Sequence, residues 1–161
     1  MQRDKAADQR IELLSEFVNL KECGFMVKTD MIRVMQVMLG LQSNAIKFTK
    51  KGYVKHRIQI VEGFDKITHE KCKFLQCSVI DTGIGIEPKD QKKLFKLFGF
   101  VKNSQQLNKN GIGLGLVILD KITNQFGSKI TFQSTPNEGS VFTFQFQLEQ
   151  QMHFEQYRQK A

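Results

Sequence analysis

The chain has 161 residues, of which 40% are hydrophobic and 25% charged, as expected for one globular domain with a substantial core. Its net charge is +8, but the lysines are scattered and no helix-turn-helix, zinc-finger or RNA-binding pattern accompanies them, so we expect no nucleic-acid partner. No apolar run could cross a bilayer and no signal peptide is recognisable, which predicts a cytoplasmic domain without direct membrane contact, even if the full-length protein is membrane-anchored.

Residues 1–29 form a lead-in whose start carries no clear structural signal. The apolar residues at 11–18 suit either an edge strand or a short helix, and we interpret them as a strand. The main domain is predicted at 30–148, and the polar residues 149–161 are predicted to form a tail.

A long amphipathic helix is predicted at 30–51, because apolar residues recur there at three- and four-residue steps along one face. Thr29 or Asp30 can cap its start, since short polar side chains accept hydrogen bonds from the first helical amides. Gly52 lies where a left-handed C-terminal cap is expected.

The remaining elements alternate between strands and helices. Strands are predicted at 53–61, 73–80, 129–134 and 141–148, a polar connection at 63–71, a turn at 136–139, a short helix from Pro88 through Phe98, a mobile loop at 99–110, and a helix at 113–126 that ends at Gly127. This order predicts an α/β fold: a mixed, largely antiparallel sheet covered on one side by helices, in a two-layer sandwich.

Asn44 lies within the predicted long helix, between the apolar residues Leu41 and Ala45, and therefore borders its buried face. It is either a solvent-facing residue or a ligand, and its amide oxygen would suit Mg²⁺, which prefers oxygen ligands and usually also binds substrate phosphates. Lys47, nearly one turn further, would place an ammonium group beside those phosphates.

Asp81 is predicted at the end of a strand, with Gly83 and Gly85 after it. A carboxylate in this place can start a turn, or it can accept a hydrogen bond from the exocyclic amine of adenine. In the second case the glycines would let the backbone approach the ring, and Ile84 and Ile86 would line an apolar wall for the base.

Gly111, Gly113 and Gly115 precede a predicted helix. Such glycines leave backbone amides free to meet phosphate oxygens, and the helix start adds partial positive charge, although glycine also permits tight helix packing. The segment is no Rossmann motif, because a polar loop rather than a strand precedes it, and no Walker loop, because no GK[ST] follows.

Together and in this order, these segments resemble the catalytic ATP-binding domain of sensor histidine kinases in the GHKL superfamily, which also includes gyrase, mismatch-repair and heat-shock chaperone ATPases. Residues 30–49, with Arg33 and Gln36, resemble the N box, 81–86 the first glycine box, 94–98 the F box, 111–116 the second glycine box, and 139–142 the closing segment before the last strand. The resemblance covers 30–148.

The resemblance implies a Bergerat-type ATP-binding fold, with ATP and Mg²⁺ held between helices and a flexible lid at 99–110. It implies that Asn44 and Lys47 are catalytic, that Asn44 is the metal ligand, that Lys47 meets phosphate, and that Asp81 reads adenine. The other residues implied to contact ATP are Gly83, Gly85, Ile86, Phe98, Gly111, Gly113, Leu114, Gly115 and Ser140.

The implied activity is transfer of the γ-phosphoryl group to a histidine on a separate dimerisation domain of the same protein, followed by a response-regulator receiver domain as acceptor. None of the three histidines, His56, His69 and His153, lies in a helical hairpin, and we interpret all three as surface residues. The chain therefore resembles one module of a larger kinase, beginning just after the dimerisation helices.

Gly40 departs from the family pattern. Kinases that resemble this chain usually carry an asparagine there, one helical turn before the metal ligand, and hydrolytic relatives carry a glutamate that activates water. Without that carboxylate, efficient ATP hydrolysis is not expected. Weak kinase activity remains open, since phosphoryl transfer depends mainly on positioning and charge neutralisation, and so does a catalytically weak nucleotide sensor or scaffold. A hydrolytic ATPase is the least favoured alternative.

Overall fold

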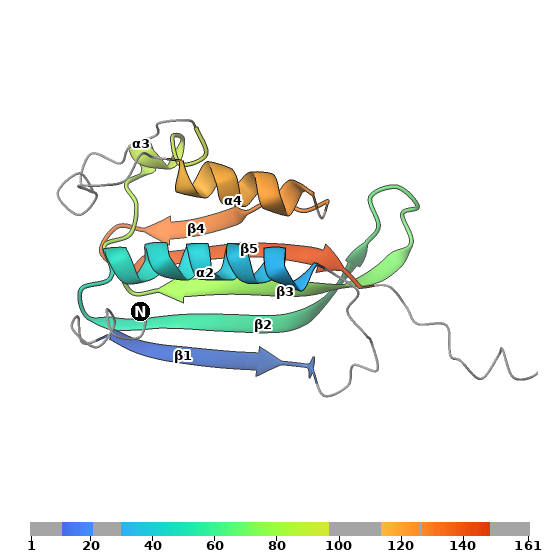
Figure 1. The fold of residues 1–161 in the computed structure, drawn as a ribbon, viewed down its shortest axis with the longest axis horizontal. Helices are drawn as coiled ribbons and strands as arrows, with labels where there is room; N and C mark the ends of the chain where they lie inside the picture. Colours follow the sequence, from blue (N-terminus) through green and yellow to red (C-terminus); the bar gives the residue numbers. More distant parts are fainter. Residues whose placement is uncertain (1–10, 21–29, 97–113, 126, 149–161) are drawn as a thin grey trace, which may run out of the picture.

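The computed structural model describes residues 11–20, 30–96, 114–125 and 127–148, which form a five-stranded sheet with helices on one face (Figure 1). The elements are β1 (Ile11–Val18), α2 (Met31–Phe48), β2 (Gly52–Phe64), β3 (Lys71–Asp81), α3 (Pro88–Gln91), α4 (Gly115–Asn124), β4 (Thr131–Thr135) and β5 (Gly139–Gln147). The strand order is β1-β2-β3-β5-β4, with β1 parallel to β2 and the other neighbours antiparallel. The predicted mixed two-layer sandwich is confirmed.

The strand predicted in the lead-in is confirmed as β1, which lies at the edge of the sheet (Figure 1). Ile11 pairs with Gly52 and Val18 with Gln59 in the parallel register. Ile11 is buried, whereas Phe17 near the other end of the strand is 64% exposed. β1 therefore adds a strand to the sheet but only partly enters its core.

Helix α2 begins as predicted, because the Asp30 carboxylate caps it by accepting a hydrogen bond of 3.2 Å from the Arg33 amide. At its other end the predicted cap at Gly52 is wrong: the helix ends at Phe48, and Gly52 begins β2 with a φ of +119°. Thr49 ends the helix instead, since its amide (3.0 Å) and its hydroxyl (2.8 Å) both donate to the carbonyl of Ala45.

The physical reason for this early end lies in the loop after β3. The Ile84 amide donates a hydrogen bond of 3.2 Å to the carbonyl of Phe48, which a glycine cap would otherwise satisfy. Gly52 is needed for a different contact, because a Cβ there would overlap the hydroxyl of Thr82. A tertiary contact therefore replaces the local C-terminal cap.

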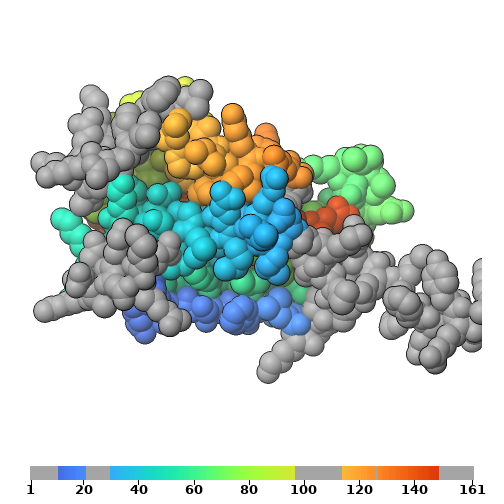
Figure 2. Space-filling model, in the orientation of Figure 1, coloured from blue at the N-terminus to red at the C-terminus, as the bar shows by residue number. Residues whose placement is uncertain are grey.

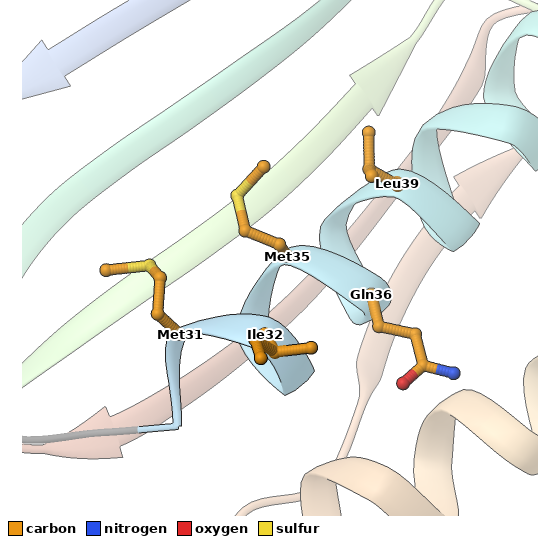
Figure 3. Close-up of a pocket in the computed structure, with 5 residues that line it drawn as sticks. All are labelled: Met31, Ile32, Met35, Gln36 and Leu39. Atoms are coloured by element: carbon orange, nitrogen blue, oxygen red, sulfur yellow. The ribbon is translucent and has the colours of Figure 1, made fainter.

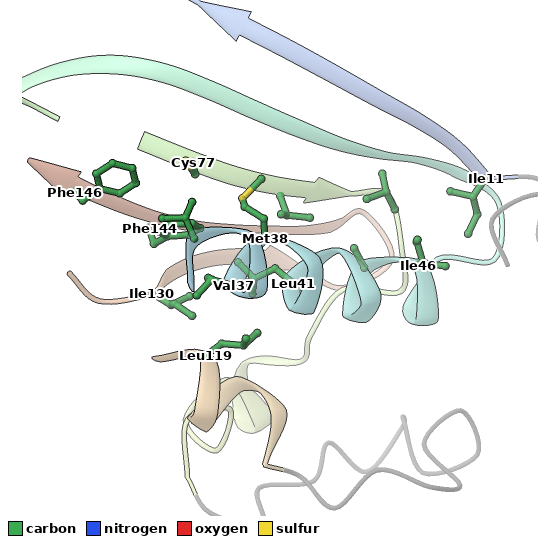
Figure 4. Close-up of a cluster of buried hydrophobic side chains, with 14 residues drawn as sticks. Ile11, Val37, Met38, Leu41, Ile46, Cys77, Leu119, Ile130, Phe144 and Phe146 are labelled. Atoms are coloured by element: carbon green, nitrogen blue, oxygen red, sulfur yellow. The ribbon is translucent and has the colours of Figure 1, made fainter. Parts of the chain in front are cut away.

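The core lies between α2, α4 and the helix-facing side of the sheet (Figure 4). Its most deeply buried members are Val37, Leu41, Val54, Cys77, Val79 and Phe144. The strand predicted at 141–148 is confirmed as β5, with Phe144 and Phe146 buried and Phe142 packed against the core. Burying each such side chain contributes about 1.5–3 kcal/mol.

His56 corrects one prediction. We expected a surface residue, but the side chain is half-buried, on the same side of β2 as Val54 and Ile58. Period-two alternation along the strand places it there, because residues two apart share a face of the sheet. His69, at a positive φ of 57° in the turn between β2 and β3, is exposed as predicted, and His153 lies outside the described residues.

The helix predicted from Pro88 through Phe98 is shorter than expected, since α3 ends at Gln91 and the chain continues as turns to residue 96. Amides there bond to carbonyls three residues back, the tighter pattern of a 3₁₀ turn. This path brings Phe95 against Phe132 of β4, with the ring centroids 5.9 Å apart. Phe98 lies outside the described residues.

Helix α4 ends at Asn124, two residues before the predicted end at 126, and Gly127 follows it as predicted, with a positive φ of 68° and its amide bonded to the carbonyl of Asn124. Leu119 is buried, and Leu116 and Ile122 pack against the core. The predicted lid at 99–110, the tail at 149–161 and Phe126 lie outside the described residues. None of the described helices is long and apolar enough to cross a membrane.

Candidate functional site

Asp81 is the last residue of β3, and its carboxylate is buried at 7% exposure. Its Oδ1 accepts a hydrogen bond of 2.8 Å from the amide of Gly83. Burial raises the pKa of Asp81 to about 6, although hydrogen bonds from the Gly83 and Ser140 backbone act in the opposite direction. The result is a buried hydrogen-bond acceptor that gains a proton in mildly acidic solution.

The loop after Asp81 is held from three sides. Ile84 bonds to the carbonyl of Phe48 at the end of α2, and its own carbonyl accepts a bond of 2.8 Å from the Asn137 amide in the β4–β5 turn. The side chain of Gln91 donates to the carbonyls of Ile86 (2.9 Å) and Ser134 (3.1 Å). These bonds fix the loop, and with it Asp81, against the end of α2 and the β4–β5 turn.

The glycines of this loop permit close approaches of protein backbone. A Cβ at Gly83 would lie 2.5 Å from the carbonyl oxygen of Phe48. Gly85 has a φ of +63°, and a Cβ there would overlap the carbonyl of Thr135. The structure therefore gives these glycines a packing reason that the sequence did not reveal. Their contact with an adenine ring stays a prediction.

Ser140 lies beside Asp81, because the two residues pair in the antiparallel register of β5 and β3. The Ser140 side chain is buried, and its hydroxyl lies 2.9 Å from the hydroxyl of Ser134. The residue before it, Gly139, has a φ of +123°, and a Cβ there would overlap the carbonyl of Asp81. The structure thus brings Asp81, Gly83 and Ser140 together.

Asn44 and Lys47 lie in the last turns of α2 and are half-buried. The Lys47 ammonium is 5.5 Å from the centre of the Phe48 ring. Asn44 precedes Phe48 by four residues, about 6 Å along the helix axis, and so lies on the same side of the helix. Because Phe48 contacts the loop after Asp81, Asn44 lies one turn from that contact.

Helices α2 and α4 run antiparallel and lie directly against each other (Figures 1 and 2). They approach closely at Gly40, where an added Cβ would lie 2.7 and 2.8 Å from the two methyl carbons of Leu119. One turn from Gly40 towards the end of α2 is Asn44, and one turn from Leu119 towards the start of α4 is Gly115. This register places Asn44 opposite the first turn of α4.

The start of α4 suits an anion. Its first amides have no partner within the helix, and the helix dipole makes this end positive. The preceding residue, Leu114, supplies no side-chain cap, and a Cβ at Gly115 would meet no described atom within 4 Å. Gly111 and Gly113 lie outside the described residues, so this part of the predicted phosphate cradle is seen only at Leu114 and Gly115.

Within the described ranges, no three His, Cys, Asp or Glu side chains gather in a way that could hold a metal ion.

A shallow apolar groove lies elsewhere, on the first half of α2 (Figure 3), and is lined by Met31, Ile32, Met35, Gln36 and Leu39. Met31, Met35 and Leu39 point to one side, and all three are substantially exposed. The groove is at the opposite end of α2 from Asn44, so it is not part of the candidate site.

Sequence reasoning missed Leu119 as a neighbour of the site. The available signal was Gly40, because a glycine in the middle of a helix is destabilising and usually has a packing reason. Gly40 alone does not identify its packing partner, because Leu119 belongs to a helix about 80 residues further along the chain.

This arrangement, a mostly antiparallel sheet with helices on one face and a buried carboxylate at the end of a central strand, defines an α/β two-layer sandwich of the Bergerat type. The chain belongs to the family described as Histidine kinase-, DNA gyrase B-, and HSP90-like ATPase, whose profile matches residues 29–150.

Among curated relatives, the chain is 41% identical over 113 residues to the sensor histidine kinase GacS of Pseudomonas protegens, covering 70% of this chain and 12% of the relative. It is 38% identical over 120 residues to the signal transduction histidine-protein kinase BarA of Escherichia coli K12, covering 74% and 12%. The chain thus spans only a small part of the length of these relatives.

Solved structures agree with the fold. The catalytic domain of the histidine kinase ThkA, in a nucleotide-free form, superposes with a TM-score of 0.65 at 28% identity, covering 90% of this chain and 84% of that one. Full-length ShkA, crystallised in complex with AMPPNP, superposes with a TM-score of 0.68 at 25% identity, covering 90% of this chain and 27% of that one.

Proposed function

We propose that this chain is the ATP-binding catalytic module of a two-component sensor histidine kinase, and that it transfers the γ-phosphoryl group of ATP to a histidine on a dimerisation domain of the same protein. The observation that carries the proposal is that the end of β3, the end of α2 and the start of α4 lie at one end of the molecule (Figure 1). A buried acceptor, an amide oxygen and an open helix start match the base, the metal ion and the phosphates of one nucleotide.

In this proposal Asp81 binds adenine. As a carboxylate it can only accept hydrogen bonds, and Gly83 already donates to one of its oxygens. The adenine amine would donate to the remaining acceptor positions, in a buried place where a hydrogen bond to charge is stronger than in water. The rigid loop around Asp81 supports the assignment, since it holds the acceptor before the base arrives.

Asn44, Lys47 and the start of α4 would hold the other end of the nucleotide. Asn44 contributes an amide oxygen to Mg²⁺, Lys47 contributes positive charge, and the first amides of α4 donate to phosphate oxygens. The metal ion, when bound, would supply neutralisation of the phosphate charge. The protein's own contribution is to fix the phosphates relative to the attacking imidazole nitrogen.

Gly40 supports a second candidate, a nucleotide-binding sensor or scaffold with little catalysis. The residue has no side chain that could order the phosphates or activate water, so the chain lacks one contributor to transition-state positioning. The same feature disfavours a hydrolytic ATPase.

In the full-length protein a receiver domain would be the next phosphoryl acceptor, and the module would bind ATP in the cytoplasm. Relatives that carry kinase names, such as GacS and BarA, support the kinase assignment.

The test is to mix the module with the separately expressed histidine-containing hairpin of the full-length protein and ATP labelled on its γ-phosphate. The expected result is label on the hairpin that disappears when its histidine is replaced with glutamine. Nucleotide binding without any labelled hairpin would contradict the kinase assignment and favour the sensor.

A further inference from the structure

The side chain of Leu119 occupies the space beside Gly40 at the contact between α2 and α4. The methyl carbons of Leu119 lie where a side chain at position 40 would begin, at 2.7 and 2.8 Å from an added Cβ. Contacts this short do not occur between real side chains, so any residue larger than glycine requires Leu119 or the whole of α4 to move.

Leu119 has little freedom to withdraw. Its side chain is only 7% exposed and belongs to the same buried cluster as Val37, Leu41 and Ile130, which lie on the side of it that faces α2 and the sheet in Figure 4. Protein cores are packed at the density of crystals, so a displaced leucine pushes on its neighbours rather than into empty space. Rotation of Leu119 would carry its methyl groups into these neighbours, so we expect a larger residue at position 40 to be accommodated by a shift of α4 away from α2.

The position of α4 matters for only one half of the proposed nucleotide site. Asn44 and Gly115 each lie one turn from the Gly40–Leu119 contact, on facing helices. Asp81 is held by β5 and by its own loop, which bonds to the end of α2 and to the β4–β5 turn but not to α4. The adenine end is thus built without α4.

We propose that Gly40 and Leu119 are a matched pair of positioning residues, which sets the magnesium and phosphate half of the site and leaves the adenine half untouched. The inference rests on the proposed function. It also explains the departure at position 40: a polar side chain there is incompatible with Leu119, so the family's usual residue could be restored only together with a smaller residue at position 119.

The test compares two probes by calorimetry in wild type and variants. Adenosine requires only the adenine half, whereas AMP-PNP with magnesium requires both halves. Gly40→Ala is expected to weaken magnesium AMP-PNP by about tenfold and adenosine by less than about twofold. The double variant Gly40→Ala/Leu119→Ala is expected to recover magnesium AMP-PNP affinity to within about threefold of wild type, because the smaller residue removes the overlap.

Gly63→Ala is the matched control. A Cβ at Gly63 would lie 2.7 Å from a ring carbon of Phe74, the same clash distance as at Gly40, but at the opposite end of β2 and β3 from Asp81. It is expected to change neither affinity, even if it lowers the melting temperature. A selective loss in this control would mean that overlap anywhere in the fold weakens the phosphate half, which would overturn the proposal.

Equal losses for the two probes in Gly40→Ala, or no recovery in the double variant, would also overturn it. If Gly40→Ala does not fold, Leu119→Val takes its place: it keeps Gly40, loosens the same contact, and is expected to weaken magnesium AMP-PNP by about threefold without affecting adenosine. If Leu119→Val does not weaken magnesium AMP-PNP more than adenosine, the proposed role of Gly40 and Leu119 is refuted. Failure of the wild type to bind either probe would instead refute the proposed function.

Discussion

Asp81 is buried at the end of β3, and this burial raises its pKa from the usual 3.8 to about 6. In the proposed site the charged form of Asp81 accepts a hydrogen bond from adenine, so nucleotide binding should favour loss of the proton. We expect ATP affinity to be constant above about pH 7 and to fall by up to about tenfold per pH unit below pH 6. Calorimetric titrations from pH 5 to 8 measure this, and a flat profile would contradict it.

The same residue should link stability to function. A carboxyl group whose pKa is raised in the folded protein stabilises it at low pH, and this contribution is lost as pH rises through 6. At pH 7.5 the charged carboxylate therefore costs stability, and Asp81→Asn should raise the free energy of unfolding by about 1–3 kcal/mol. The variant should also bind ATP at least about tenfold more weakly, a loss of about 1.4 kcal/mol.

Chemical denaturation and calorimetry on Asp81→Asn test the two effects separately. Unchanged affinity in a folded variant would remove Asp81 from the adenine site. Unchanged stability, with affinity lost, would mean that the buried carboxylate is better solvated than its position indicates.

His56 should make the protein sensitive to acid. Burial lowers its pKa, and its Nε2 has no hydrogen-bond partner among the described residues. The folded protein thus favours the neutral imidazole, and stability should be lost as pH falls through the unfolded-state value near 6.5, by at most about 1.4 kcal/mol per pH unit. In His56→Leu this part of the pH dependence should disappear, whereas His69→Asn, in an exposed turn, should retain it. Equal pH dependence in all three proteins would contradict the assignment.

At the scale of elements, α2 carries the metal prediction. Asn44→Ala should leave the helix intact, since alanine is the better helix former, but should remove the amide oxygen proposed for Mg²⁺. In the wild type, removing magnesium should weaken ATP binding by about tenfold, and in Asn44→Ala the affinity should be almost the same with and without the metal. Ser43→Ala, at an exposed neighbouring position, is the control. A persistent magnesium dependence in Asn44→Ala would exclude the residue as a ligand.

The loop between β3 and α3 carries the last prediction. Gly85 has both a positive φ of 63° and a close approach to Thr135, so Gly85→Ala combines backbone strain with overlap and should cost about 3 kcal/mol. Gly127 has a similar φ of 68°, but a Cβ there meets no described atom within 4 Å, so Gly127→Ala should cost only about 1 kcal/mol. The difference between the free energies of unfolding of the two variants, measured by denaturant melts, gives the cost of the overlap at Gly85. Equal losses of stability would show that only the backbone strain matters.

Strand β5 and the start of α2 could be predicted from sequence, whereas the end of α2 could not. β5 alternates phenylalanine with polar residues, and α2 begins at a capping aspartate, so both could be recognised because their signals lie within a few neighbouring residues. The end of α2 could not be recognised in this way. Phe48 receives its hydrogen bond from Ile84, a residue distant in the chain, and no local pattern near Gly52 announces that.

At the scale of the whole molecule, the candidate site exists because the sheet and helices bring distant segments to one end. The N-box asparagine, the strand-end aspartate and the start of α4 come from elements that the sequence separates by tens of residues. Their order and composition were enough to predict the fold and the family, since each segment carries the residue types that its own chemistry needs. The residues predicted at 98–113 lie outside the described ranges and stay predictions.

The kinds and order of the elements, the family and the residues proposed to bind nucleotide could all be inferred from sequence, because periodicity, capping residues and short motifs are local and can be read along the chain. The three-dimensional arrangement was needed to see that the loop glycines serve backbone contacts, that His56 is half-buried, and that Leu119 fills the space beside Gly40. Van der Waals overlap and burial depend on which distant residues meet, and a linear pattern does not contain that information.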